Sequence, residues 1–120
     1  MKTIRLVLAL CALMVLNPSC HLKSIVNVND YYAPTTGRLP IYQTGQQLPT
    51  NIIRIGSIVV GEGGLTPANK CTYEACIRLI EDEAKKAGAD LVYLVHVKEP
   101  GFWSTCYNLT AELYKYDKQQ

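Results

Sequence analysis

The clearest pattern of apolar and polar positions lies between residues 72 and 87. Apolar residues recur there every three or four positions, which places them on one stripe of a helix: Tyr73, Cys76, Ile77, Ile80, Ala84 and Ala87. Thr72 suits the N-cap and Gly88 suits the C-terminal stop. Glu74 in the first turn and Lys86 in the last turn complement the helix dipole. The sequence therefore predicts one amphipathic helix over residues 72–87.

Three other segments have patterns typical of β-strands. Residues 52–60 are rich in β-branched side chains, and residues 91–97 form a nearly continuous apolar run, which predicts a central strand buried on both faces. Apolar and polar residues alternate over 106–116, so one face of that strand should pack on the helix and the other should face water or a partner. The order predicts an α+β fold, a small mixed sheet of about three to four strands with one main helix packed on one face.

The segment from residue 20 to residue 50 has no helical period and is rich in Asn, Asp, Pro and Gly. Such residues favour turns and linkers. We therefore expect an irregular tether here, with Leu39-Pro40-Ile41-Tyr42 as a candidate short edge strand, since proline is tolerated at a sheet edge.

The first twenty residues have the pattern of a secretion signal. Lys2 and Arg5 precede an unbroken run of eleven apolar residues, Leu6 to Leu16, and Ser19 precedes Cys20. The run is shorter than the roughly 20 residues that cross a bilayer. A cysteine at this place indicates a bacterial lipoprotein that is cut before Cys20, lipidated there and anchored to the membrane by its acyl chains. Cleavage by an ordinary signal peptidase, giving a soluble exported product, is the alternative, since Asn17 and Pro18 are unusual before a lipidation site.

These patterns divide the chain into a lipoprotein signal peptide over 1–19, a lipid-anchored irregular tether over 20–50 and an α+β domain over 51–120.

The charge balance of the chain bears on the class of partner. Of the twelve basic residues, ten remain once Lys2 and Arg5 are removed with the signal, and they face ten acidic residues. A neutral domain argues against nucleic acid as a partner, because nucleic-acid binding needs a basic surface.

Cysteine and histidine are the candidates for chemistry. Export into an oxidising compartment favours a disulfide among Cys71, Cys76 and Cys106. A metal site would use these three with His96, but their spacing matches no zinc motif. A catalytic cysteine would need a base, and His96 on an apolar strand is more typical of a structural residue. We therefore predict no metal, no cofactor and no catalytic residue.

Aromatic residues near the end of the chain are the candidates for binding. Phe102 and Trp103, the only residues of their types, adjoin in a predicted loop, where they would form a binding tip or plug the end of a small core. Tyr114 and Tyr116 fall on the predicted open face of the last strand. We expect a partner surface formed by the tether, Phe102, Trp103, Tyr114 and Tyr116.

The segment from Ile55 to Tyr114 resembles the RcsF-like and YbjQ-like families of bacterial envelope lipoproteins. The resemblance rests on Ile55-Gly56-Ser57 in a strand, Cys71 before a helix, the sequence from Ala84 to Val92, and Cys106 at the start of the last strand. It covers about half of the chain and lacks a match for a second bridge in the RcsF-like proteins. It implies a lipidated, disulfide-stapled domain on the outer membrane that contacts envelope proteins without catalysis.

The resemblance also implies a disulfide between Cys71 and Cys106. Both residues flank elements that can meet at one end of the domain, whereas Cys71 and Cys76 are too far apart along a helix. A Cys76–Cys106 bridge stays open, because Cys76 lies on the stripe that faces the sheet. The functional expectation is a non-catalytic binding or stress-sensing module with an envelope protein as partner. A heavy-metal-binding protein and an exported thiol or redox protein are the alternatives.

Overall fold

The computed structural model describes residues 22–62, 70–102 and 104–118. The elements in chain order are β1 (Leu22–Val28), β2 (Ile41–Tyr42), β3 (Ile52–Glu62), α2 (Tyr73–Ala87), β4 (Leu91–Lys98) and β5 (Asn108–Tyr116). Cys20 and Trp103, to which the sequence assigned roles, lie outside the described residues.

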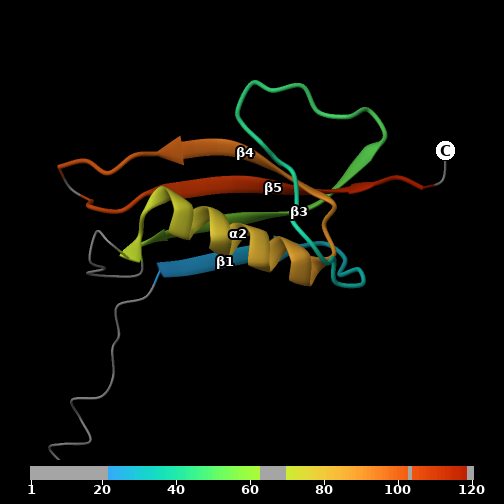
Figure 1. The fold of residues 1–120 in the computed structure, drawn as a ribbon, viewed down its shortest axis with the longest axis horizontal. Helices are drawn as coiled ribbons and strands as arrows, with labels where there is room; N and C mark the ends of the chain where they lie inside the picture. Colours follow the sequence, from blue (N-terminus) through green and yellow to red (C-terminus); the bar gives the residue numbers. More distant parts are fainter. Residues whose placement is uncertain (1–21, 63–69, 103, 119–120) are drawn as a thin grey trace, which may run out of the picture.

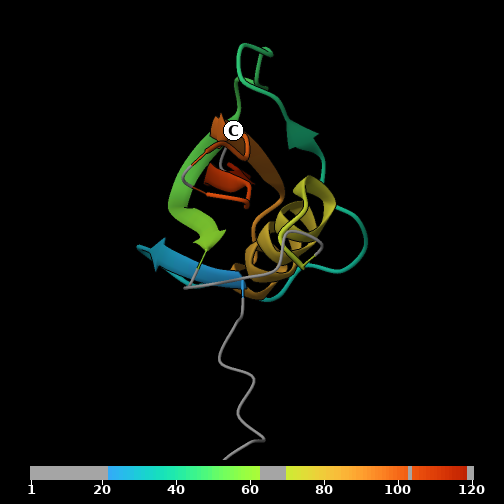
Figure 2. The ribbon, with the colours of Figure 1, turned by 90° about the vertical axis from the view of Figure 1, so that its left-hand side faces the viewer.

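The five strands form one mixed sheet in the order β1-β3-β5-β4-β2. Three of the four strand pairings are antiparallel, and only the short β2 runs parallel to its partner β4. The helix α2 lies along one face of this sheet (Figure 1), and the sheet curls around it (Figure 2). The predicted α+β class, the mixed sheet and the single packed helix are confirmed.

The helix α2 forms where the sequence predicts it because both of its ends are capped locally. The Thr72 side chain accepts a hydrogen bond from the Ala75 N–H at 3.2 Å. Gly88 adopts a left-handed conformation with φ 80°, and its N–H donates to the carbonyl groups of the last turn. The apolar stripe faces the sheet, with its most buried members at Cys76, Ile80, Ala84 and Ala87.

The core lies between this stripe and one face of the sheet. Alternate residues of β5 supply its centre, and Leu109, Ala111 and Leu113 are fully buried, as the alternation predicts. Ile58 and Val60 of β3 and Val92 and Leu94 of β4 extend the same layer: these four side chains are also fully buried. The domain therefore has one apolar layer under α2 and a second sheet face that α2 does not cover.

The expected irregular tether over residues 20–50 is wrong for its first part, and the sheet has more strands than the three to four predicted. Leu22–Val28 forms β1, which pairs with β3 from Leu22 opposite Glu62 to Val28 opposite Gly56. The following segment is also fixed to the domain. The Tyr32 N–H donates to the Ala87 carbonyl at 3.1 Å, and the Thr35 hydroxyl donates to the Ala89 carbonyl at 2.7 Å.

The expectation that β4 is buried on both faces is correct only for its first half. Leu91 and Val92 are fully buried, but Val95 is 40% exposed and His96 is exposed. The reason is that β2 pairs only with Val92 and Tyr93, so β4 becomes an edge strand beyond them. A register shift against β5 between Leu94 and His96 also falls in this half.

Candidate functional site

The sheet face that α2 leaves uncovered carries a row of side chains across four strands, which we call the uncovered row: Ile25, Val59, Thr110 and His96. These residues are direct cross-strand neighbours in the register of the sheet. Ile25 is 71% exposed and Val59 is 42% exposed. A hollow of about 240 Å³ lies beside the two, lined also by Lys23, Ser24, Gly61 and Asn108.

Sequence reasoning missed Ile25 because it placed the residue in a tether. The strand β1 alternates in burial, with Leu22, Ser24, Val26 and Val28 turned inward and Lys23, Ile25 and Asn27 exposed. The residue types do not follow this period of two, because polar Ser24 lies among the inward positions and apolar Ile25 among the exposed ones, so the sequence pattern does not mark the strand.

A polar network adjoins the uncovered row on the same face and includes one predicted residue, Tyr114. The Tyr114 hydroxyl donates to Glu112 Oε2 at 2.5 Å, and Glu112 Oε1 forms an ion pair with Arg54 Nε at 3.3 Å. Burial raises the pKa of Tyr114 to about 12, together with the hydrogen bond to Glu112 and its negative charge. Tyr114 is half-buried, and its hydroxyl is bound by Glu112, two residues earlier on the same strand.

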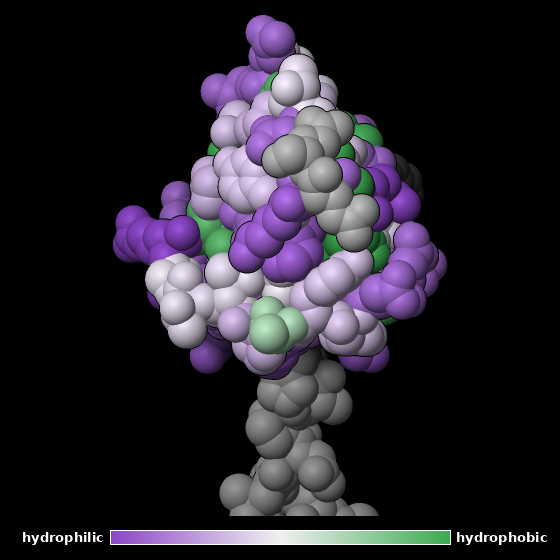
Figure 3. Space-filling view, turned by 90° about the vertical axis from the view of Figure 1, so that its right-hand side faces the viewer, coloured by the Kyte–Doolittle hydropathy of each residue, from purple (hydrophilic) through white to green (hydrophobic). Residues whose placement is uncertain are grey.

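Tyr116 lies at the far end of β5, opposite Ile52, and is 37% exposed. Its N–H donates to Asp90 Oδ2 at 2.9 Å, and Lys115 pairs with the same Asp90 oxygen at 3.6 Å. Figure 3 views the molecule from this end, where hydrophilic and intermediate residues dominate the surface.

Phe102 lies at the other end of the sheet, in the connection between β4 and β5, and is 92% exposed. The nine residues of β5 separate it from Tyr116. The structure therefore does not bring Phe102 together with Tyr114 and Tyr116, and the single surface expected from the sequence divides into two separate places.

The cysteines form the predicted bridge. Cys71 and Cys106 are joined by a disulfide with 5.1 Å between their Cα atoms. Cys76 is a buried free thiol whose Sγ donates to the Tyr107 carbonyl at 3.7 Å, and burial raises its pKa. The rival Cys76–Cys106 bridge is thereby excluded.

The four side chains considered for a metal site do not form one. Two of the sulfur atoms, those of Cys71 and Cys106, are bonded to each other, while His96 is exposed on β4. Across the described part of the chain, no group of three His, Cys, Asp or Glu side chains could hold a metal ion. Within the same residues, no helix is long and apolar enough to span a bilayer.

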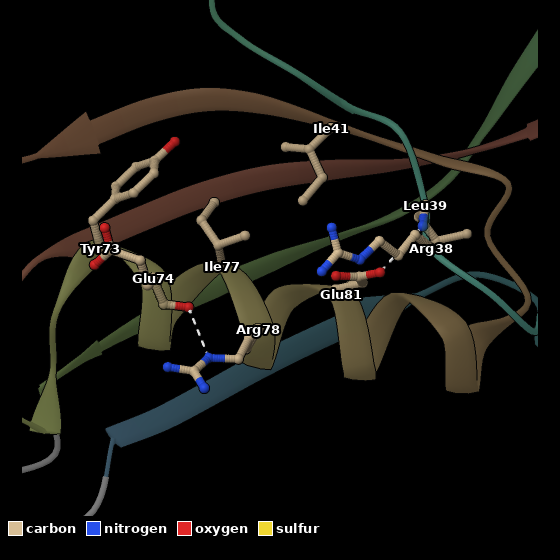
Figure 4. Close-up of a pocket in the computed structure, with 8 residues that line it drawn as sticks. All are labelled: Arg38, Leu39, Ile41, Tyr73, Glu74, Ile77, Arg78 and Glu81. Atoms are coloured by element: carbon tan, nitrogen blue, oxygen red, sulfur yellow. Dashed lines mark hydrogen bonds between the residues drawn. The ribbon is translucent and has the colours of Figure 1, made fainter.

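A pocket of about 390 Å³ lies between α2 and the segment that leads into β2 (Figure 4). Its apolar lining comes from Leu39, Ile41, Tyr73 and Ile77, and its charged lining from Arg38, Glu74, Arg78 and Glu81. The two positive and two negative charges balance, so the pocket has no net charge to select an ion. No pattern in the sequence indicates this pocket, because the fold alone brings Arg38 close to Glu81.

Glu81 joins α2 to the segment that leads into β2. Its Oε1 accepts the Leu39 N–H at 3.2 Å and pairs with Lys85 Nζ at 3.3 Å. Burial acts to raise the pKa of Glu81, but the hydrogen bond from Leu39 and the charges of Lys85 and Arg38 outweigh it and hold this pKa below the ordinary value. The carboxylate is thus a structural anion in this arrangement.

Comparisons of the chain with protein-family models, with curated proteins and with solved structures found no match.

Proposed function

We propose that this protein is a bacterial envelope lipoprotein, anchored through Cys20, that acts as a non-catalytic binding module for another envelope protein. The uncovered row is the observation that carries the proposal. The solvent side of an antiparallel sheet is usually polar, yet Ile25 and Val59 stand side by side there and remain exposed. Apolar side chains with a polar surround are typical of protein interaction sites.

The geometry of β1 adds a second contact that a partner could use. Within the described residues β1 pairs only with β3, so it forms an edge of the sheet. An edge strand can accept a strand from a partner through main-chain hydrogen bonds, while neighbouring side chains give specificity. Ile25 would supply that specificity, because it lies on this strand and points away from α2.

The bridge between Cys71 and Cys106 agrees with what the resemblance to the RcsF-like proteins implies. The two alternative functions have less support. A thiol enzyme needs a reactive thiolate, but Cys76 is buried with a raised pKa. A metal-binding protein would need sulfur ligands, two of which are joined in the bridge.

Site-specific photo-crosslinking in bacterial cells tests the proposal. The full chain would carry p-benzoylphenylalanine in place of Ile25 or Val59, with Asp82, an exposed residue of α2, as the matched control position. We expect a discrete protein adduct from positions 25 and 59 and none from position 82. Equal adducts at all three positions, or none at 25 and 59, would contradict a partner site on the uncovered row.

A further inference from the structure

We propose that one end of the domain lies against the membrane and that Phe102 inserts among the lipid headgroups. We call this end the proximal end, defined by the start of β1, the start of α2 and the described residues of the β4–β5 connection, 99–102 and 104–107. This inference rests on the proposed lipid anchor at Cys20, and its partner is a lipid surface.

The length of chain between Cys20 and β1 sets the distance to the membrane. Only His21 separates Cys20 from Leu22, the first residue of β1. Two residues span at most about 7 Å even when fully extended. An acylated Cys20 would therefore hold the start of β1 close to the bilayer surface.

The register of the sheet places the β4–β5 connection at this same end. Leu22 pairs with Glu62, Val60 pairs with Leu109, and Lys98 pairs with Asn108. Figure 1 shows the start of β1 and the β4–β5 connection on the same side of the molecule. Three strand spacings separate β1 from β4, roughly 15 Å. The connection therefore lies within one domain's width of the anchor.

The connection is held in place at its base and at its tip. The bridge from Cys106 to Cys71 ties its base to the start of α2, and the Tyr107 N–H donates to the Cys71 carbonyl at 3.2 Å. At the tip, the Gly101 N–H donates to the Ser104 carbonyl at 2.7 Å. These bonds present Phe102, which is 92% exposed, at the end of a closed hairpin.

Charges of both signs lie at the proximal end. Lys23, Lys70 and Lys98 are exposed there, together with the acidic Glu74 and Glu99. An exposed aromatic ring beside lysines is the combination that places a loop at a membrane interface. The opposite end, seen in Figure 3, is mostly hydrophilic.

Tryptophan fluorescence of the full lipidated protein in vesicles tests the orientation. The vesicles would contain phosphatidylethanolamine, phosphatidylglycerol and lipids brominated near the headgroup, since bromine quenches nearby indole rings. One variant combines Phe102→Trp with Trp103→Phe, and its matched control combines Tyr116→Trp with Trp103→Phe. Each variant then has one tryptophan, at the proximal or at the distal end, because Trp103 is the only one in the chain.

We expect quenching at position 102 to be several-fold stronger than at position 116. If the N-terminal peptide carries acyl mass but positions 102 and 116 are quenched equally or not at all, the orientation is overturned and the anchor stands. If the peptide carries no acyl mass, the anchor and the orientation both fail.

Discussion

At the scale of single residues, burial and one neighbour decide what the polar side chains can do. Glu112 binds Arg54 and Tyr114 at the same time, so two residues of β5 and one of β3 form one polar network on the uncovered face. Cys76 has the opposite surroundings, an apolar layer in which free cysteine behaves as a small hydrophobe. Its thiol should therefore resist alkylation until the protein unfolds.

Tyr114 should ionise well above the ordinary range of a tyrosine. Its pKa of about 12 lies above the ordinary value near 10 because the site is buried and Glu112 is negative. A pKa raised in the folded state means that this contribution to stability is complete below about pH 10 and is lost as the pH rises through about 12. Glu112→Gln should lower the pKa of Tyr114, as followed by phenolate absorbance.

The variant Tyr114→Phe assigns that titration step, since it should remove the phenolate transition near pH 12. A wild-type titration in which every tyrosine ionises in the ordinary range would contradict the network between Glu112 and Tyr114.

At the scale of elements, the sequence predicted the helix that local residues define, and it missed the strand that depends on a distant partner. The helix α2 could be predicted because Thr72 and Gly88 cap it within one turn of its own sequence. The strand β1 could not be predicted, since it contains Lys23, Ser24 and Asn27. It owes its structure to a partner strand more than twenty residues later in the chain. Strand formation depends on such pairing more than on intrinsic preference.

The same difference between local and long-range determinants explains which parts of the candidate site could be predicted from the sequence. The pairing of Cys71 with Cys106 was expected from the resemblance, while the residues alone left Cys76–Cys106 open because Cys76 lies on the stripe that faces the sheet. The sequence placed Phe102 in a loop but left open whether it was exposed or plugged the end of the core, and its separation from Tyr116 required the direction of β5 to be traced along the sheet. Ile25 and the pocket at Arg38 depend on where residues 22–41 dock, which their own pattern does not state.

Gly88 should tolerate alanine much less well than Gly45 does. Both have positive φ, 80° and 87°, but a Cβ on Gly88 would lie 2.7 Å from the Ala33 carbonyl oxygen, while Gly45 has open space. Gly45→Ala should lower the free energy of unfolding by about 1–2 kcal/mol, the cost of the left-handed backbone. Gly88→Ala should cost more, because a docked backbone must also move. Urea unfolding checks both, and equal losses would contradict the docking of residues 32–35.

Two adjacent residues of β1 test whether this strand belongs to the domain. Val26 is half-buried and packs against the core, whereas Ile25 is 71% exposed. Val26→Asp should lower the free energy of unfolding by about 1–3 kcal/mol, and Ile25→Asp should change it by less than about 0.5 kcal/mol. Chemical denaturation measures both values. Equal, small effects would mean that β1 contributes nothing to the fold in solution.

At the scale of the whole molecule, the position of β1 determines which end of the domain lies nearest the proposed lipid anchor. Because the sheet begins two residues after Cys20, the domain has little tether and its proximal end is set beside the proposed anchor. The uncovered row then runs across the side of the domain, where a neighbouring envelope protein could reach it. The Cys71–Cys106 bridge holds the proximal end together, and its loss should cost about 2–5 kcal/mol of unfolding free energy.

Lipidation of Cys20 is the claim on which this arrangement depends most. Mass spectrometry of the N-terminal peptide, from full chain made in bacteria and purified from the membrane fraction, tests it directly. The account predicts a mature protein that begins at Cys20 and carries acyl mass on that residue, and it predicts that Cys20→Ala abolishes both. A mature chain that begins at another residue, or a Cys20 without acyl mass, would contradict it.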